Sequence, residues 1–332
     1  MSTSTMSMDH SPAGMTPDPV MHALRLHERG GPEQLVYEEA PIPFVGIGDV
    51  LLRVHALSFT PTELGWPSTW EDRGGKDRRP VIPAHEVSGV VMALGYGTTG
   101  MRIGDAVYGL TDWYRDGAAA EYVAVEARNL APIPSSLTHV QAVGMLMGGL
   151  TAWQALFVHG RLEAGQWVLI HGAGGGVGTV AVQLAHAAGA HVVATGHASS
   201  QQLVTELGAE VFVNVDQDRF EESGEAVDLV FDLVGGDVLH RSWSVVKPGG
   251  AIVSIVEDPG AAPDGEDGTR GVLFVVEPNR AELDELSRRI DAGELRPIIG
   301  QVLPLADGRD AFAAKQRHAV PGKIVLQVGD DR

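Results

Sequence analysis

The chain of 332 residues contains no cysteine. This absence excludes disulfides, thiolate nucleophiles and every zinc site that depends on Cys ligands. Basic residues are also few, because 24 Lys and Arg stand against 43 Asp and Glu, which gives a net charge of −19. Nucleic-acid binding requires a clustered cationic surface, and the densest basic stretch, residues 73–79, is short and includes Asp77. We therefore expect no nucleic-acid partner, and the acidic surface indicates solubility.

Signal-like and membrane-like segments are lacking as well. Residues 1–19 have neither a basic region nor an apolar core, so they do not resemble a secretory signal. We predict a disordered leader over residues 1–20, or a misplaced start site. One apolar stretch, residues 142–158, is shorter than a usual membrane span and holds three glycines with Thr151 and Gln154. A buried helix is expected there, so we predict a cytoplasmic protein without membrane contact.

Hydrophobic residues make up 44% of the chain, which is enough for two buried cores in a chain of this length. The N-terminal part has short apolar runs separated by Pro and Gly. These runs are residues 23–26, 50–57, 87–94, 105–109 and 121–125. Short strands with frequent turn residues predict a compact β-rich domain.

The pattern changes near Thr138, where helical segments begin to alternate with short apolar strands. The expected strands are residues 168–171, 191–195, 211–215, 229–233 and 251–256, and the expected helices are residues 179–188 and 200–207. This alternation predicts a doubly wound parallel sheet, so the fold class is α/β. A helix at residues 281–292 then leads to β-like segments at residues 298–303 and 322–328, which we expect to rejoin the first domain.

A cluster of glycines directly follows the expected strand 168–171 and precedes the expected helix 179–188. Its residues are Gly172, Ala173, Gly174, Gly175, Gly176, Val177 and Gly178. The spacing Gly172-x-x-Gly175-x-x-Gly178 is one residue longer than the G-x-G-x-x-G pattern. Glycines permit a tight turn and let backbone N–H groups approach a pyrophosphate, while the helix N-terminus supplies partial positive charge. The context predicts a Rossmann-type site for a nicotinamide dinucleotide, with a flexible linker as the alternative.

The end of the second expected strand indicates which cofactor is used. NAD-binding domains usually carry an acidic residue there, which bonds the ribose hydroxyls. This segment has no carboxylate, and its expected cofactor contacts are Thr195, Gly196, His197, Ser199 and Ser200. A carboxylate would repel a 2′-phosphate, whereas hydroxyls and a histidine can donate to it. The segment therefore favours NADP(H), and the alternative is that it forms only a polar loop.

Seven short motifs follow one another along the chain. They are residues 83–91 (PAHEVSGVV), 104–109 (GDAVYG), 116–122 (DGAAAEY), 149–153 (GLTAW), 231–236 (FDLVGG), 247–250 (KPGG) and 322–325 (GKIV). In these motifs and their order the chain resembles the medium-chain dehydrogenase/reductase superfamily, specifically its zinc-independent quinone oxidoreductase (zeta-crystallin-like) branch. The first motif is similar to the family's G-H-E-x-x-G segment, with Ala84 in place of the glycine.

The resemblance implies a fold and an assembly. It implies a discontinuous GroES-like catalytic domain of residues 21–140 and 296–332, and a Rossmann NADP-binding domain of residues 141–295. It also implies a homodimer joined through an edge strand of the Rossmann sheet, which would place residues 272–276 at the contact. By the same resemblance, Thr151 contacts the cofactor near the nicotinamide.

Zinc-using relatives of this superfamily hold a catalytic metal through Cys and His. A catalytic zinc needs at least three protein ligands, whereas the adjacent His85 and Glu86 cannot easily face one point. We therefore predict no metal. Without a Lewis acid, quinones and α,β-unsaturated carbonyls are the easier hydride acceptors, because their negative charge delocalises onto oxygen. The expected function is that of an NADPH-dependent, zinc-free oxidoreductase acting on such acceptors.

Candidate residues for the chemistry lie in the N-terminal half. The expected catalytic groups are His85 and Tyr114, each of which can serve a developing oxyanion as a proton or hydrogen-bond donor. The expected substrate pocket consists of Thr60, Glu63, Trp66 and Trp70. Thr60 and Glu63 stand where many relatives have Asn and Asp. The structural alternative is that the aromatic residues pack under loops and that His85 belongs to the core.

The later strand ends should meet the nicotinamide end of the cofactor. The residues expected there are Val234, Ile255 and Phe274, whereas Asp232 is expected to support a turn rather than perform chemistry. Two other functions stay open. One is a non-catalytic NADPH-binding protein with a regulatory or structural role, and the other is a trans-acting enoyl reductase of a biosynthetic pathway. Carrier arms bear phosphate, so the acidic charge balance argues against the second.

Overall fold

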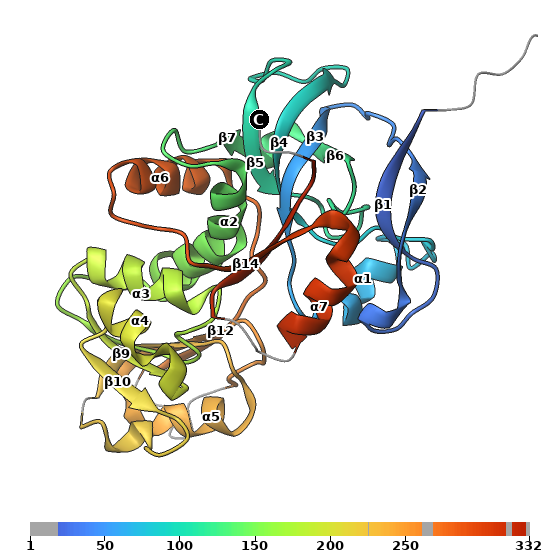
Figure 1. The fold of residues 1–332 in the computed structure, drawn as a ribbon. Helices are drawn as coiled ribbons and strands as arrows, with labels where there is room; N and C mark the ends of the chain where they lie inside the picture. The colour runs from blue at the N-terminus through green and yellow to red at the C-terminus, as the bar shows by residue number, and fades with distance from the viewer. Residues whose placement is uncertain (1–18, 225, 261–267, 317–320, 330–332) are drawn as a thin grey trace, which may run out of the picture.

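The computed structural model describes residues 19–224, 226–260, 268–316 and 321–329. A β-rich domain and a Rossmann domain lie side by side, each with a sheet of its own (Figure 1). The prediction of a leader over residues 1–20 falls almost wholly outside the described residues, and Val20 already begins strand β1.

Seven strands form the main sheet of the β-rich domain, in the order β14-β15-β3-β4-β5-β7, with β6 also paired to β3. The strands of this domain are β1 (Val20–Leu26), β2 (Leu35–Pro41), β3 (Asp49–Ser58), β4 (Glu86–Leu94), β5 (Ala106–Leu110), β6 (Tyr122–Glu126), β7 (Leu130–Pro132), β14 (Ile299–Pro304) and β15 (Lys323–Gln327). Strand β15 runs antiparallel to β3, with Val325 opposite Ser58. Residues from the end of the chain therefore complete a sheet that the N-terminal strands begin.

Six parallel strands form the sheet of the Rossmann domain, in the order β10-β9-β8-β11-β12-β13. These strands are β8 (Trp167–Ile170), β9 (His191–Gly196), β10 (Val211–Asn214), β11 (Val227–Asp232), β12 (Val246–Ser254) and β13 (Arg270–Leu273). Counted from β8, this is the 3-2-1-4-5-6 order of a dinucleotide-binding sheet, whose ligands bind at the carboxyl ends of the strands where the order reverses. The predicted α/β fold class, a β-rich domain with a doubly wound parallel sheet, is confirmed.

Helices cover both faces of the parallel sheet. In the described residues the α-helices of this domain and its border are α2 (His139–Trp153), α3 (Gly178–Ala187), α4 (Gln201–Glu206), α5 (Gly236–Arg241) and α6 (Arg280–Asp291), whereas α1 (Pro67–Trp70) and α7 (Gly308–Gln316) pack in the β-rich domain. Val168 and Ile170 of β8 belong to the core cluster formed with α2, α3, α4 and α6, whereas Leu169 belongs to the cluster beneath α5. This alternation is what a strand buried on both faces requires.

Helix α2 lies in the core and continues as a π-helical segment over Gln154–His159. Thr138 and Gln141 form a capping box that satisfies N–H groups at its start. Among the described residues, one helix, His139–His159, is long and apolar enough to cross a membrane, but 78% of its apolar window is buried inside the fold. The predicted buried helix is confirmed. Its Gly148 allows a close approach, since a Cβ there would lie 2.5 Å from the carbonyl oxygen of Gly176.

Some elements escaped the sequence analysis. Strand β7 has three residues, too few to show a period, and β2 turns Glu39 and other exposed residues to solvent. The edge strand expected at residues 272–276 lies earlier, because β13 ends at Leu273. Beyond it the backbone leaves the sheet, and the Glu277 N–H donates instead to the side chain of Gln154 at 3.1 Å.

Candidate active site

The glycine turn, residues 172–178, connects β8 to α3. Gly172 has a φ of +72°, a left-handed conformation that glycine adopts without strain. A Cβ on Gly178 would lie 2.4 Å from the carbonyl oxygen of Gly172, so a side chain does not fit there. The Ala173 N–H donates to the Thr195 carbonyl at 3.0 Å, which ties the turn to β9. The turn thus presents the N-terminus of α3 at the carboxyl edge of the sheet, the geometry that binds a pyrophosphate.

Two other segments pack closely against the glycine turn. A Cβ on Gly174 would lie 2.5 Å from Cβ of Ser200, which follows β9. A Cβ on Gly176 would lie 3.0 Å from Cδ of Lys323 in β15, and the Gly322 N–H donates to the Gly174 carbonyl at 3.3 Å. The turn therefore lies where the two domains meet, with a cation beside it. These residues fit the phosphates of a dinucleotide.

Lys323 also forms a buried ion pair with Glu86 at the start of β4. Their side chains are 8% and 0% exposed. The second carboxylate oxygen of Glu86 accepts the N–H of Met147 in α2 at 3.0 Å. In the sequence Lys323 stands out only as a member of a motif, and Glu86 only as a motif residue that was rejected as a metal ligand. Their partnership could not be read from the chain, because it depends on β15 returning to the N-terminal sheet.

His85 directly precedes β4 and is buried, with 2% of its surface exposed. Its Nδ1 is 2.7 Å from the hydroxyl oxygen of Thr111, and Trp113 meets its ring edge-on with 5.1 Å between centroids. Burial lowers the pKa of His85 to about 3, and the charge of Arg78 acts in the same direction. His85 is therefore a neutral imidazole at neutral pH, which can donate a hydrogen bond but does not act as an imidazolium acid.

An aromatic wall leads away from His85. The ring of Trp113 makes an edge contact with Trp66 at 5.7 Å as well as its contact with His85. Tyr114 instead is 38% exposed, and the guanidinium of Arg73 lies over its ring at 5.0 Å. The structure thus joins Trp66 and His85 through Trp113, which sequence analysis missed because it lies in an irregular loop. It places Tyr114 at the surface beside Arg73, and the catalytic role expected for Tyr114 stays a prediction.

Trp70 requires a correction, because it belongs to the core. Its side chain is 2% exposed, and its indole N–H donates to the Leu64 carbonyl at 2.8 Å. A large apolar ring with a satisfied N–H is the usual state of a buried Trp. The alternative that this aromatic residue packs under a loop is the one the structure shows.

Glu63 does not line an open pocket as expected, because only 1% of its surface is exposed. Its carboxylate accepts the Thr60 N–H at 2.9 Å and the Ala84 N–H at 2.6 Å. Burial raises the pKa of Glu63 to about 7, and the two backbone N–H groups act against this rise. The side chain therefore braces two loops instead of facing an acceptor. Thr60 itself is half-buried beside it.

The end of β9 contributes less to the predicted ribose site than expected. Thr195 is 2% exposed, and its hydroxyl lies 3.0 Å from Nδ1 of the buried His171, so it points into the core. Ser200 is also buried, and its hydroxyl donates to the His197 carbonyl at 2.8 Å. A Cβ on Gly196 would meet that hydroxyl at 2.7 Å. These residues shape the edge, and their hydroxyls are already hydrogen-bonded.

His197, Ala198 and Ser199 are the exposed residues of this segment. His197 Nδ1 lies 3.1 Å from a carboxylate oxygen of Asp216, which follows β10. The absence of a carboxylate in residues 195–200 was the reason to favour NADP(H), and the fold now brings one in from the neighbouring strand. The sequence alone does not reveal Asp216 as a neighbour of His197, since adjacency across a parallel sheet leaves no local pattern.

The residues at the ends of the later strands differ in their exposure and in their contacts. Asp232 accepts the Val234 N–H at 3.1 Å, which confirms that it supports this turn. Val234 is 49% exposed and lies beside the glycine turn, so it can still meet a cofactor. Ile255 and Phe274 pack against the core cluster, and Thr151 is buried within α2.

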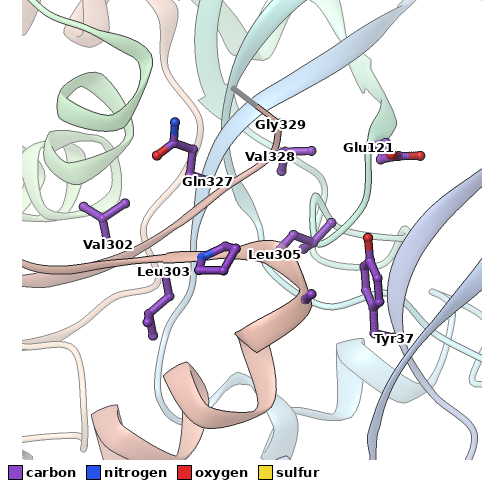
Figure 2. Close-up of a pocket in the computed structure, with 10 residues that line it drawn as sticks. Tyr37, Glu121, Val302, Leu303, Leu305, Gln327, Val328 and Gly329 are labelled. Atoms are coloured by element: carbon purple, nitrogen blue, oxygen red, sulfur yellow. The ribbon is translucent and has the colours of Figure 1, made fainter. Parts of the chain in front are cut away.

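A separate cavity of about 470 Å³ lies on the β-rich domain (Figure 2). Tyr37 and Glu121 line one side of it, and Leu305 and Val328 are among the residues from the C-terminal part of the chain on the other. None of the residues that line it belongs to the predicted cofactor or substrate sites. This cavity is therefore not part of the candidate active site.

The side chains near the site do not fit a catalytic zinc. Within the described ranges, no group of three or more His, Asp or Glu side chains could hold a metal ion. The two residues that the motif offers have other partners, because His85 bonds to Thr111 and Glu86 pairs with Lys323. A zinc site needs three protein ligands that converge on one point.

Two family models match the chain: the alcohol dehydrogenase GroES-like domain over residues 46–135, and zinc-binding dehydrogenase over residues 207–326. The structure of the quinone oxidoreductase from Coxiella burnetii superposes with a TM-score of 0.86 at 28% identity, covering 94% of this chain and 100% of that one. This likeness extends over both domains.

Two relatives are similar in sequence over most of their length. The 2-methylene-furan-3-one reductase of Solanum lycopersicum is 30% identical, with 86% of this chain and 73% of that protein matched. The chloroplastic NADPH-dependent alkenal/one oxidoreductase of Arabidopsis thaliana is 30% identical, with 92% and 79% matched. The chain therefore belongs to the zinc-independent quinone oxidoreductase branch of the medium-chain dehydrogenase/reductase superfamily.

In this quinone oxidoreductase homologue, the candidate site has two parts. The glycine turn and Lys323 form a cationic edge that fits phosphates, and the aromatic wall of Trp66, Trp113 and His85 offers a flat apolar surface. Such an arrangement can hold a dinucleotide and orient a planar acceptor against it.

Proposed function

We propose that this quinone oxidoreductase homologue is an NADPH-dependent enzyme that transfers a hydride to a quinone or an α,β-unsaturated carbonyl without zinc. The observation that carries the proposal is the position of the glycine turn, which lies at the meeting of two domains with Lys323 against it. The acceptor class is supported by two relatives, which are named an alkenal/one oxidoreductase and a furanone reductase.

The glycine turn would hold the cofactor. When bound, NADPH would supply a hydride from the nicotinamide ring. Backbone N–H groups at the start of α3 would bond the pyrophosphate, and the Lys323 ammonium would offset its charge. Glu86 already neutralises Lys323, so the ammonium would act as a well-placed hydrogen-bond donor as well as a positive charge.

The aromatic wall would hold the acceptor. A quinone or enone is flat, so the faces of Trp66 and Trp113 suit it. His85 would act as a neutral donor to the oxygen on which negative charge develops, and Thr111 fixes its orientation through Nδ1. A neutral donor stabilises an oxyanion without needing protonation at low pH. The proton that completes the reduction would come from a group other than an imidazolium.

We also infer a cytoplasmic homodimer, with the contact at the open edge of β13. Leu273 is 47% exposed at that edge, and Val275 just beyond it is 72% exposed. The free edge of a strand with apolar side chains is a surface that proteins usually cover. Light scattering of the purified protein tests this, and a monomer at micromolar concentration would contradict it.

The test of function is NADPH oxidation, followed at the nicotinamide absorbance band, with a panel of quinones and enones. Each assay is repeated with NADH and with a metal chelator. Turnover with NADPH that survives the chelator is the expected result. Binding of NADPH without turnover on any acceptor would favour a regulatory role, and turnover abolished by the chelator would overturn the zinc-free mechanism.

A matched pair of variants locates the cofactor. Gly178→Ala places a Cβ 2.4 Å from the Gly172 carbonyl oxygen, so it should distort the glycine turn and weaken NADPH binding at least about tenfold. Gly65→Ala adds the same methyl where nothing lies within 4 Å, so NADPH binding should be unchanged. Equal NADPH affinity in the two variants would show that the turn is not the cofactor site.

A further inference from the structure

One buried carboxylate braces the turn that leads into the candidate active site. Glu63 lies at the start of a single helical turn, Glu63–Gly65, and is 1% exposed. Its two oxygens reach in different directions, one to the Thr60 N–H at 2.9 Å and one to the Ala84 N–H at 2.6 Å. The second bond spans 21 residues of sequence, so it is a tertiary contact and not part of a local turn.

Ala84 has an unusual backbone conformation. Its φ is +72°, the left-handed region in which a Cβ is strained and glycine is favoured. The Ala84 carbonyl accepts the Ala118 N–H at 2.5 Å. Gly117 packs closely against the same carbonyl, since a Cβ on Gly117 would lie 2.2 Å from its oxygen. The Ala84 peptide groups are thus held on both sides, by Glu63 at the N–H and by residues 117–118 at the carbonyl.

The residues that follow Ala84 are those of the candidate site. His85 contacts Thr111 and Trp113, and Glu86 pairs with Lys323 beside the glycine turn. A change in φ at Ala84 would rotate the chain that carries both side chains. The direction of His85 and of Glu86 therefore depends on a conformation that an alanine does not prefer.

We propose that Glu63 is a positioning residue, whose carboxylate holds Ala84 in the left-handed conformation and so aims His85 and Glu86 at the candidate site. With glycine at position 84, this conformation would need no such brace. The family motif has glycine there, and this chain has alanine together with the longer carboxylate at position 63. The proposal requires that Glu63 and residue 84 be energetically coupled.

Burial of Glu63 supports this role. An apolar environment raises the pKa of its carboxyl, and the nearby charge of Glu86 adds to the effect while Lys323 opposes it. A buried ionisable group is unfavourable unless its hydrogen bonds repay the loss of water. Both oxygens of Glu63 accept hydrogen bonds from backbone N–H groups of the two loops.

The test is a double-mutant cycle with Glu63→Gln, Ala84→Gly and both changes together. Glu63→Gln keeps the shape but turns an N–H₂ group toward one of the two backbone donors. We expect it to lower the melting temperature and to lower kcat/KM for the acceptor by about tenfold when residue 84 is alanine, a coupling usual for residues in contact. In the Ala84→Gly background both losses should be much smaller. The NADPH Kd should change less than kcat/KM, because the glycine turn is tied to β9 and only the Glu86–Lys323 pair beside it depends on this brace.

A readout independent of turnover is the imidazole NMR signal of His85. It should shift in Glu63→Gln and return toward its original position when Ala84→Gly is added. The activity readout rests on the proposed function, whereas this signal and the melting temperatures do not, so a protein without turnover still tests the brace. Additive losses, or an unshifted His85 signal, would overturn the proposal. If Glu63→Gln does not fold, rescue of folding by Ala84→Gly is the expected coupling, and no rescue would overturn it.

Discussion

The ammonium of Lys323 lies against the carboxylate of Glu86 inside the protein, while the aliphatic part of Lys323 packs on Gly176 of the glycine turn. The pair therefore connects the sheet of the β-rich domain to the cofactor edge of the Rossmann sheet. Its geometry gives Lys323 two possible roles, one in stability and one in cofactor binding. These roles can be separated by experiment.

Lys323→Met should destabilise the fold, because it leaves the Glu86 carboxylate buried without an opposite charge. Breaking a buried pair on one side costs about 3–5 kcal/mol. Adding Glu86→Gln should recover most of the free energy of unfolding, measured by denaturant titration. NADPH binding, measured by fluorescence, should stay at least about tenfold weaker in the double variant, because the cation near the phosphates is still missing. Recovery of tight binding would mean that Lys323 acts through stability alone.

His85 and Tyr114 should differ sharply in their effect on turnover. Removing the neutral donor with His85→Ala is expected to lower kcat about 100-fold, as loss of an oxyanion donor does in other enzymes. Tyr114→Phe should leave kcat nearly unchanged, because this ring is exposed beside Arg73. Because the pKa of His85 is lowered to about 3, His85 does not ionise near neutral pH. The pH profiles of kcat/KM for wild type and His85→Ala should therefore have the same shape near pH 7. A large loss in Tyr114→Phe would contradict this assignment.

The sequence predicted the layout of the Rossmann half because its signals are local. The run Val168 to Ile170, the glycines after it and the period of α3 are contiguous, and the structure has β8 and α3 within about one residue of the expected bounds. Strand β7 and the helix α7 were missed because three residues show no period and an isolated amphipathic stretch has no flanking motif. The edge strand was displaced because Val275 reads as strand although it lies off the sheet.

The candidate site was predicted less well, because its contacts join distant segments. Residue type alone placed Trp70 and Glu63 in the pocket, whereas burial and backbone hydrogen bonds place them beneath it. The residues that do contact His85 and Glu86 are Trp113, Thr111 and Lys323. They reach these positions only when strands β5, β4 and β15 assemble. Side-chain identity predicts which chemistry a residue can perform, but the fold decides whether it faces a ligand.

Asp216 should influence the choice between NADPH and NADH. Its carboxylate lies 3.1 Å from His197 Nδ1, at the edge where a Rossmann fold holds the adenosine ribose. Asp216→Asn removes negative charge there, so it should raise the preference for NADPH, expressed as a ratio of kcat/KM values, by about threefold to tenfold. His197→Gln should lower the same ratio. Equal changes for the two cofactors would place the ribose elsewhere. Ser199→Ala removes a hydroxyl without a charge change, so it separates the effect of charge from that of a hydrogen bond to the 2′-phosphate.

Glu63 should give the stability of the protein an unusual pH dependence. Its pKa is raised from 4.5 to about 7 in the folded state, so the folded protein binds the proton more tightly than the unfolded chain. The resulting stabilisation is complete below about pH 4.5 and is lost as the pH rises through about 7. The size of the effect is about 3 kcal/mol. His85 acts in the opposite sense, because its lowered pKa of about 3 makes stability rise with pH up to about 6.5.

These two trends partly cancel in the wild-type protein, so a single pH profile would hide both. The difference between wild type and Glu63→Gln isolates the carboxyl, since His85, with a pKa of about 3, stays neutral in the folded state of both proteins above pH 4.5. The wild-type advantage in free energy of unfolding, measured by denaturant titration from pH 4.5 to pH 8, should shrink steadily to pH 7 and then level off. An advantage that grows with pH would mean that the two backbone donors lower the pKa of Glu63 more than burial raises it, which would overturn the direction of the pKa shift but not the bonds from Thr60 and Ala84.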